Sequence, residues 1–575
     1  MKKIFNNLKP YKVYIIAALL CIFSQSIFQL ILPKLSANII NIGIVNNDKG
    51  YILSTGVKML LISLCTVAVA VMASFFSSKA AMGFGKSLRE AMFEKVESFS
   101  LHEFDKIGTA SLITRTTNDV TQLQMVTMIF FRMVVMAPMM AIGGIIMAIT
   151  TAPSMSYIFA IVIPAIAIVV MTISHLSLPL FRTMQRKIDK LNRIMRENLT
   201  GSRVIRAFNR LHFEKKRFSM ANIELTDVAV KVNRLMAVLM PLIMLIFNVT
   251  AVAIVWLGSF KVNASQMAVG NLTAFIQYAM EIMFSTMMMS IVFIMMPRAV
   301  ASAERINEVL NMEPEIVDSE NPAKPDDLQG TIEFKDVSFN YPDAAEPAVT
   351  GISFTARPGC TTAIIGATGS GKSTLLNLIM RFYDVTKGSI TIDGTDIRDI
   401  PQELLRSVIG YVPQKSVLFT GTIFENIRYG KDNATDEEVR SAAETAQATE
   451  FINNMKNGYE TMLSEGGANV SGGQKQRLCI ARAIVRRPGI YLFDDSFSAL
   501  DFKTDANLRM ALSRDTGNST RIIVAQRVAT VMNADQIIVM DEGRIAGIGK
   551  HEELYKNCET YKNIVLSQLS EEEIA

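Results

Sequence analysis

Residues 366–373 read GATGSGKS, and the fold of the second half of the chain follows from these eight residues. They fit the pattern G-x-x-x-x-G-K-S, in which glycines allow backbone N–H groups to converge on the phosphates of a nucleotide. The apolar run Thr361–Ile365 precedes them, and the helical run Thr374–Phe382 follows them. A strand, a glycine-rich loop and a helix N-terminus are the context that this pattern requires. The sequence therefore predicts an α/β P-loop domain that binds ATP.

Residues of this loop are expected to bind both ATP and Mg²⁺. Lys372 is expected to reach the β- and γ-phosphates, and the hydroxyl of Ser373 can bind Mg²⁺. Farther along the chain, Ile490–Asp494 reads as a buried strand that ends in a carboxylate, which suits the Mg²⁺ shell of a P-loop protein. The predicted nucleotide contacts in and after the loop are Gly366, Thr368, Gly369, Ser370, Gly371, Lys372, Ser373 and Thr374.

The first half of the chain is dominated by long apolar runs, from about residue 13 to 300. Runs of about 20 apolar residues suit helices that cross a bilayer. We expect six such helices, at about residues 14–40, 53–80, 126–150, 156–178, 236–260 and 271–297. The predicted fold class is therefore an N-terminal, all-α, polytopic membrane domain with six transmembrane helices, followed by the α/β P-loop domain.

The charges between the apolar runs predict how the helices are oriented in the lipid bilayer. Two long connections, at about residues 81–125 and 179–235, are rich in Lys and Arg, whereas the short connections carry little charge. Such positive residues favour the cytoplasmic side. We therefore expect a multi-pass membrane protein with both termini and the ATP-binding domain in the cytoplasm.

A charged, proline-rich segment separates the two halves. The expected domains are residues 1–312 in the membrane half, 313–330 as a linker, and 331–575 as the ATP-binding domain. The net charge of +5 is small for 575 residues and gives no support to a nucleic-acid partner.

A second glycine-rich motif, Val470-Ser-Gly-Gly-Gln474, lies between the loop and the strand-end aspartate. It resembles the Leu-Ser-Gly-Gly-Gln signature of ABC transporters, and residues 108–119 and 197–208 resemble the two cytoplasmic loops of ABC exporters. The resemblance implies that Tyr341 stacks on adenine, that Gln414 joins Ser373 and Asp494 around Mg²⁺, and that Asp501 belongs to a loop crossing between two cassettes. It also implies that the γ-phosphate of ATP bound by a partner subunit is held by Ser471, Gly472, Gly473 and Gln474.

Two positions depart from the family pattern. Asp495 stands where the family has a glutamate that polarises the attacking water, and Gln526 stands where it has a histidine. The aspartate is one methylene shorter, so its carboxylate lies roughly 1.5 Å farther from its target. Glutamine can hydrogen-bond a phosphate but cannot carry a proton. The two changes favour a degenerate site that hydrolyses ATP weakly; the alternative is that Asp495 is a slower working base.

The resemblance and its departures together predict a heterodimer with a homologous half-transporter. In that pair, this chain would carry the degenerate site and donate its signature to the competent site. The chain is thus similar to bacterial heterodimeric multidrug exporters, and this resemblance implies a bacterial plasma membrane. We expect ATP-driven export of hydrophobic or amphipathic compounds. Two alternatives stay open: a homodimeric exporter of lipids or peptides, and an ATP-gated regulatory subunit that transports nothing.

One ionisable residue inside a predicted membrane helix indicates a candidate cargo site. Glu281 lies about ten residues into the sixth apolar run, and Gln277 lies one turn earlier on the same face. Intramembrane acids are rare and often functional. Glu281 is expected either to attract cationic amphiphiles in a cavity or to make a structural hydrogen bond or outer-gate contact.

Overall fold

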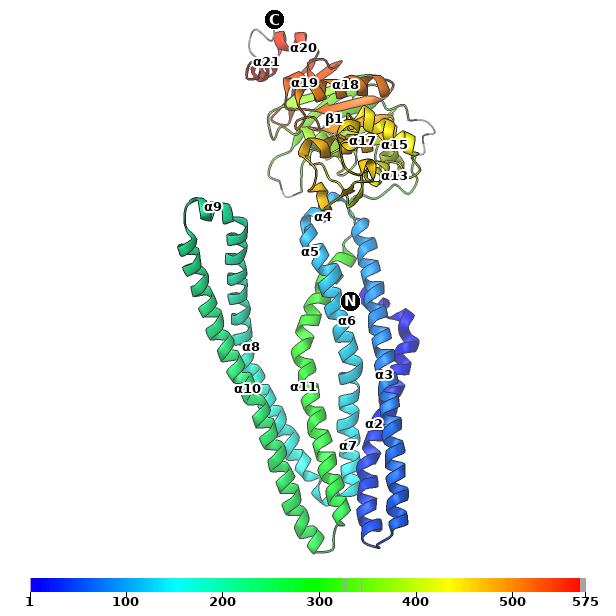
Figure 1. The fold of residues 1–575 in the computed structure, drawn as a ribbon, viewed down its shortest axis with the longest axis vertical. Coiled ribbons are helices and arrows are strands. Elements are labelled where there is room, and N and C mark those ends of the chain that lie inside the picture. The colour runs from blue at the N-terminus through cyan, green and yellow to red at the C-terminus, as the bar shows by residue number, and fades with distance from the viewer. Residues whose placement is uncertain (1, 324, 326–327, 343, 569–575) are drawn as a thin grey trace. The chain divides into compact units, whose positions relative to one another are not determined.

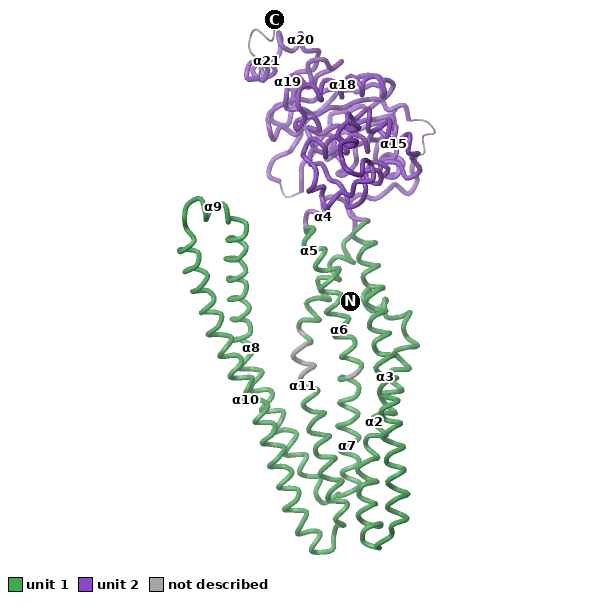
Figure 2. The backbone as a smooth tube through the Cα atoms, viewed as in Figure 1, with its two compact units in different colours: residues 1–97, 108–312 green, residues 98–107, 313–575 purple. Residues whose placement is uncertain are grey.

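The computed structural model describes residues 2–323, 325, 328–342 and 344–568; the side chains of residues 2, 132, 290–295 and 297 are outside this description. The chain forms two compact units (Figure 2). The first comprises residues 1–97 and 108–312, and we call it the membrane unit; the second comprises residues 98–107 and 313–575, and we call it the cassette. The short helix α4 (Leu101–Ile107) therefore belongs with the cassette, although its sequence neighbours lie in the membrane unit.

The membrane unit is helical throughout its described length (Figure 1). Its helices and helical turns are α1 (Lys2–Asn6), η1 (Lys9–Tyr11), α2 (Lys12–Asn38), η2 (Ile39–Ile44), α3 (Lys49–Glu97), α5 (Thr109–Thr114), η3 (Arg115–Asp119), α6 (Val120–Ile129), η4 (Phe130–Val134), α7 (Met136–Thr151), η5 (Pro153–Met155), α8 (Tyr157–Thr200), α9 (Ser202–Ala207), α10 (Leu211–Asn263) and α11 (Val269–Asn311).

Four helical segments among the described residues are long and apolar enough to cross a membrane: Lys3–Ile44, Lys49–Glu97, Tyr157–Thr200 and Leu211–Asn263. The third predicted membrane helix, residues 126–150, is divided among α6, the π-helical turn η4 and the shorter apolar helix α7. The sixth predicted helix lies within α11, where several side chains fall outside the description. The helical membrane domain is confirmed, and the number of six spans stays a prediction.

Helix α11 packs against α2 and α7 inside the membrane unit. The hydroxyl of Tyr278 on α11 is buried and donates a hydrogen bond of 3.0 Å to the carbonyl of Leu30 on α2. The side chain of Asn41 in η2 also contacts α11, since its amide donates to Asn271 Oδ1 at 2.9 Å and its oxygen accepts from Gly270 N at 2.8 Å. These polar contacts join α11 to α2 and η2.

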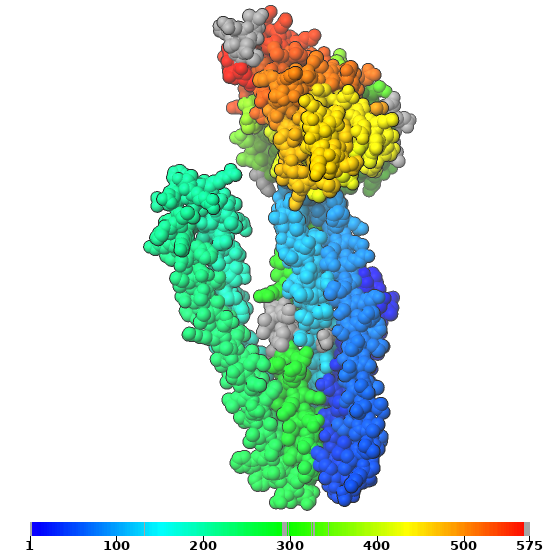
Figure 3. Space-filling model, viewed as in Figure 1, coloured from blue at the N-terminus to red at the C-terminus, as the bar shows by residue number. Residues whose placement is uncertain are grey.

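Helices α8 and α10 pack against each other and form a long arm that α9 caps. The α9 end of the arm stands apart from α5 and α6 in Figures 1 and 3. Ion pairs join the two helices there, including Lys187–Glu224 and Arg217–Glu197, each at 2.6 Å. Two apolar side chains at this end, Val204 and Phe208, are exposed to 60% and 74%. The end of the arm therefore has an uncovered apolar surface.

The cassette contains a six-stranded sheet and a four-stranded sheet. The larger sheet has the strand order β12-β11-β3-β10-β9-β6, in which every pairing except β11–β12 is parallel; the smaller is antiparallel with the order β2-β1-β4-β5. The strands are β1 (Ile332–Phe339), β2 (Val349–Ala356), β3 (Thr361–Gly366), β4 (Lys387–Ile392), β5 (Thr395–Asp396), β6 (Ile409–Val412), β7 (Gly421–Thr422), β8 (Met462–Leu463), β9 (Ile490–Asp494), β10 (Thr520–Val524), β11 (Gln536–Asp541) and β12 (Arg544–Gly549).

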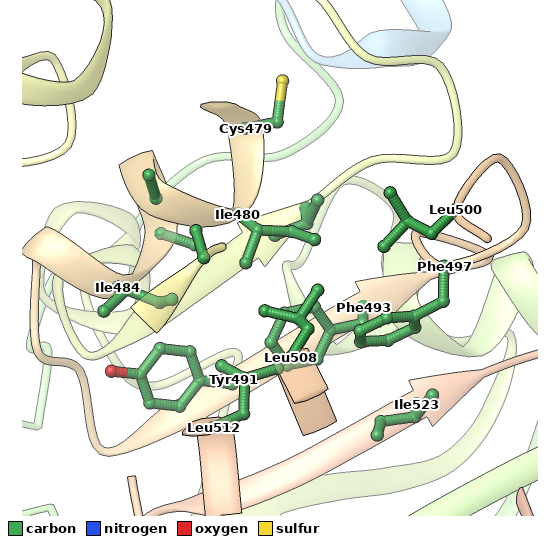
Figure 4. Packing of buried hydrophobic residues seen from close by; sticks show 14 of the residues in the cluster. Cys479, Ile480, Ile484, Tyr491, Phe493, Phe497, Leu500, Leu508, Leu512 and Ile523 are labelled. Atoms are coloured by element: carbon green, nitrogen blue, oxygen red, sulfur yellow. The ribbon is translucent and has the colours of Figure 1, made fainter. Parts of the chain in front are cut away.

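Helices cover the larger sheet and bury its parallel strands on both faces, as such strands require. Figure 4 shows part of one core, in which Ile480 of α17 and Leu508 of α18 meet Phe493 of β9. The cassette helices are α4, α12 (Lys372–Ile379), α13 (Gln402–Ser407), α14 (Ile423–Arg428), α15 (Asp436–Thr445), α16 (Thr449–Asn453), α17 (Gly472–Val485), α18 (Phe502–Asp515), α19 (Val528–Val531), α20 (His551–Asn557) and α21 (Glu559–Leu566).

Gly388 of β4 lies opposite an irregularity in the pairing of β1, between Lys335 and Ser338. We expect Gly388→Ala to lower the thermal unfolding midpoint of the full-length chain far more than Gly394→Ala. Both glycines have φ +81°, so either substitution costs about 1–3 kcal/mol of backbone strain. Only at residue 388 would the new Cβ also lie 2.3 Å from a backbone oxygen, that of Lys335. Thermal unfolding in detergent measures both midpoints, and equal shifts would contradict this explanation.

Candidate nucleotide site

The loop of residues 366–373 connects β3 to α12, as the sequence predicts. Gly371 has φ +93°, and a Cβ on it would lie 2.7 Å from the carbonyl oxygen of Ala348, so this turn requires glycine. The ammonium of Lys372 donates to the carbonyls of Gly366 and Ala367 at 2.9 and 2.6 Å. Burial lowers the pKa of Lys372, and the carboxylates of Asp495 and Asp494 oppose that shift. These contacts hold the lysine within the loop where phosphates would bind.

A cavity of about 350 Å³ lies over this loop. Its lining includes these predicted site residues: Tyr341, Thr368, Gly369, Gly371, Lys372, Ser373, Thr374, Gln414, Asp494, Asp495 and Gln526. Two other predicted residues, Gly366 and Ser370, belong to the loop but do not line the cavity. The fold therefore brings residues of five separate sequence regions to one place.

Tyr341 is held at the edge of this cavity by contacts on two sides. Its hydroxyl shares a hydrogen bond of 3.1 Å with the hydroxyl of Thr374. Its ring meets the edge of Tyr383 at a centroid distance of 5.2 Å. Burial, together with the carboxylate of Asp105 on α4, raises the pKa of Tyr383 to about 12, so its hydroxyl stays protonated and faces Asp105 Oδ2 at 3.5 Å. Tyr383 and Asp105 could not be selected from the sequence, because they are 278 residues apart and meet only in the folded cassette.

Ser373 and Asp494 offer a donor set that suits Mg²⁺. The serine hydroxyl donates to Asp494 Oδ1 at 2.8 Å, and the carboxylate is almost fully buried. Burial raises the pKa of Asp494, and the Ser373 hydrogen bond opposes this shift. Hydroxyl and carboxylate oxygens are the ligands that Mg²⁺ prefers. These two residues, with Gln414 in the same cavity, would hold the ion beside the phosphates, where it would neutralise their charge.

Asp495 and Gln526, the two departures from the family pattern, contact each other. The Gln526 side-chain amide donates to Asp495 Oδ2 at 3.0 Å. Asp495 has φ +47°, and its backbone N–H donates to the carbonyl of Val524 at 2.9 Å. Burial raises the pKa of the Asp495 carboxyl, while a hydrogen bond from Gln414 and the charge of Lys372 oppose the shift. The Asp495 carboxylate is thus engaged by side-chain amides of this chain.

The signature residues lie at the N-terminus of α17, away from this cavity. Ser471 caps the helix, since its hydroxyl accepts from Gln474 N at 3.3 Å and Gln474 Oε1 accepts from Ser471 N at 2.9 Å. A Cβ on Gly472 would meet no atom within 4 Å, whereas one on Gly473 would lie 3.0 Å from the carbonyl of Ala499. Asp501 caps α18, since its carboxylate accepts from Thr504 N at 2.9 Å, and it is exposed. The structure therefore leaves these predicted contacts outside the chain's own nucleotide cavity.

The two predicted cargo residues have different surroundings. Glu281 lines a second cavity, which lies inside the membrane unit. Gln277 is exposed and is not among the residues that line it.

A P-loop cassette joined to long apolar helices defines the class of ATP-driven membrane transporters. The family described as "ABC transporter transmembrane region" matches residues 15–287, and the family described as "ABC transporter" matches residues 349–498. An uncharacterized ABC transporter ATP-binding protein of Mycobacterium tuberculosis is 41% identical over 98% of this chain and 97% of its own length. The uncharacterized ABC transporter ATP-binding protein YfiB of Bacillus subtilis is 39% identical over 100% of this chain and 99% of its own length.

The fold is also similar to a solved structure of a bacterial Atm1-family ABC exporter with ATP bound. The TM-score is 0.82 at 25% identity, and the match covers 97% of this chain and 99% of the other. The chain therefore belongs to the ABC transporter family. It is an ABC exporter half-transporter, in which a membrane domain is fused to an ATPase cassette that couples ATP hydrolysis to transport.

Tyr341 should contribute to ATP affinity mainly through its flat ring. We expect Tyr341→Leu to weaken nucleotide binding about tenfold, because stacking of a base on an aromatic ring is lost. Tyr341→Phe keeps the ring and loses only the bond to Thr374, so its affinity should stay close to that of the wild type. Equilibrium binding of a fluorescent ATP analogue to the full-length chain measures both variants. Equal losses would show that the Thr374 contact, rather than the ring, determines affinity.

Proposed function

We propose that this chain is the subunit of a heterodimeric, ATP-driven exporter of hydrophobic or amphipathic compounds that carries the degenerate ATP site. The hydrogen bond from the Gln526 amide to the Asp495 carboxylate is the observation that supports this proposal most directly. A water-polarising carboxylate needs a free oxygen directed at the attacking water. In this site one oxygen of Asp495 already accepts an amide proton.

The chemistry of both side chains supports a weakly hydrolytic site. Asp495 is one methylene shorter than a glutamate, which withdraws the carboxylate by roughly 1.5 Å. A displacement of about 1 Å can cost on the order of a hundredfold in rate. Gln526 presents an amide, which cannot accept a proton or become positively charged. This site would therefore bind ATP and retain it through much of a transport cycle.

The exposed N-terminus of α17 supports a role in a second site. The backbone N–H groups at a helix start attract phosphate, and the space beside Gly472 is open in this chain. A homologous half-transporter whose phosphate loop faces this helix would place its γ-phosphate there. The uncovered apolar end of the α8–α10 arm supports the same conclusion, since Val204 and Phe208 offer a surface for a partner cassette.

The proposed setting is a bacterial plasma membrane crossed six times by this chain, with both termini and the cassette in the cytoplasm. ATP binding would join the two cassettes, and hydrolysis at the partner's competent site would separate them. Under this proposal the Mg²⁺ of the degenerate site is held by Ser373, Asp494 and Gln414.

The two ATP sites of the proposed pair should contribute unequally to turnover. With the partner co-purified, we expect Asp495→Asn to change steady-state ATPase activity by less than about twofold. Glutamate→glutamine at the equivalent position of the partner should abolish turnover, because that residue would be the working base. Phosphate release in reconstituted vesicles measures both. If Asp495→Asn alone stops turnover, Asp495 is a working base; robust ATPase activity of this chain without a partner would instead favour a homodimer.

A negative charge at Gly472 should inhibit the partner's site without disturbing this chain. Glutamate at a helix N-terminus is compatible with the helix dipole, and its Cβ meets no neighbouring atom here. We expect Gly472→Glu to lower the ATPase activity of the pair about tenfold or more, because it opposes the γ-phosphate charge. Gly472→Ala is the size control and should lose much less activity. Binding of a fluorescent ATP analogue to this chain alone should be unchanged in both variants; full activity of the glutamate variant would contradict the donated-signature role.

A further inference from the structure

The cavity in the membrane unit has a volume of about 450 Å³ and lies between α2, α7, α10 and α11. Cavities of roughly 300–1,000 Å³ accommodate drug-sized ligands. The residues that line it all belong to the membrane unit. It is therefore a ligand-sized space within that unit.

Glu281 of α11 contributes a carboxylate to this cavity. Its Oε2 atom is buried and has no hydrogen-bond partner among the side chains that the structure describes. The neighbouring hydroxyl of Ser285 does not donate a hydrogen bond to this Oε2 atom, because it donates to the carbonyl of Ile282 at 2.8 Å. No Lys, Arg or His is among the described residues that line the cavity; the side chain of Arg132 in η4 is not described. A carboxylate is costly to bury in its charged form unless it is paired, so a cationic ligand beside Glu281 would stabilise that charged form.

The rest of the lining is largely apolar and rich in polarizable methionine side chains. Five methionines and two phenylalanines surround the carboxylate: Met136, Met140, Met244, Met280, Met288, Phe247 and Phe284. Thioethers are polarizable and adapt to ligands of different shape. Aromatic faces attract cations through the quadrupole of the ring. This lining suits a bulky apolar body next to one positive charge.

We propose that this cavity binds a lipophilic organic monocation, with the positive charge against Glu281 and the apolar body among the methionines and phenylalanines. The inference rests on the proposed export of amphipathic compounds and narrows that cargo to cations. Gln29 and Asn248, which also line the cavity, provide neutral polar groups that can orient a substituent of the ligand.

The size of the cavity distinguishes this ligand from a metal ion. Thioethers also bind soft monovalent metals such as Cu(I). A single ion would leave most of the 450 Å³ without contacts, and unfilled apolar space forfeits dispersion attraction. A bulky cation satisfies both the carboxylate and the apolar walls.

Binding of radiolabelled tetraphenylphosphonium to the full-length chain in nanodiscs tests this site. We expect Glu281→Gln to weaken this binding about tenfold, since a desolvated charge pair is lost. Binding of radiolabelled triphenylphosphine oxide, which is neutral and of similar shape, should change little. Moving the charge across the cavity, with Gln29→Glu added to Glu281→Gln, should restore much of the affinity for the cation. Gln277→Ala is the matched control on α11, because Gln277 lies outside the lining.

If Glu281→Gln weakens binding of the cation and of the neutral ligand equally, or weakens neither, the proposal is overturned. If Glu281→Gln also lowers the thermal midpoint, Glu281→Asp becomes the deciding variant: it keeps the charge, and retained cation binding supports the site, whereas a tenfold loss overturns it. Displacement of the cation by Cu(I), with no effect of bulky organic cations, would also overturn it. The assay uses neither ATP nor a partner, so its failure is distinguishable from failure of the ATPase comparison.

Discussion

The parallel alignment of β3, β10 and β9 positions the phosphate loop, Asp494, Asp495 and Gln526 of the nucleotide site. In these strands Ile364, Val524 and Asp494 are paired side by side, so all three strands end at one edge of the sheet. The chain leaving that edge supplies the phosphate loop after β3, Asp495 after β9 and Gln526 after β10. A slip of one residue in a strand would turn its side chains to the opposite face. The contact between Ser373 and Asp494, 121 residues apart, could not then form.

Elements with a strong local pattern could be predicted from the sequence. The runs Thr361–Ile365 and Ile490–Asp494 are buried strands in the structure, because central parallel strands consist of continuous apolar residues. The long apolar helices were predictable for a related reason: lipid-facing segments need apolar residues on all sides. The division of the third predicted membrane helix, residues 126–150, was not predictable, because nothing in its composition marks the π-helical turn η4 at Phe130–Val134.

Contacts between distant residues account for what the sequence did not reveal. The pattern identified Asp495 and Gln526 as unusual, but their hydrogen bond depends on the adjacency of β9 and β10. The edge contact of Tyr383 with Tyr341 likewise depends on the folded cassette. Helical spacing puts Gln277 and Glu281 on one face of α11, yet only Glu281 faces the cavity, because the walls from α2, α7 and α10 enclose only part of that face. Helical spacing in the sequence identifies which residues share a face, but it does not show how far a neighbouring helix covers that face.

The bond between Gln526 and Asp495 also has an evolutionary consequence for the proposed pair. A glutamate at position 495 would still face an amide donor, and a histidine at position 526 would still face a carboxylate that is too short. Neither Asp495→Glu alone nor Gln526→His alone restores the matched glutamate and histidine of the family pattern. The effect of a change at one position therefore depends on the residue at the other. If the proposed pair exists, the loss of hydrolysis at this site would be hard to reverse. A lineage that had fixed both residues could not return by one step, and it would depend on the gene for the second half-transporter.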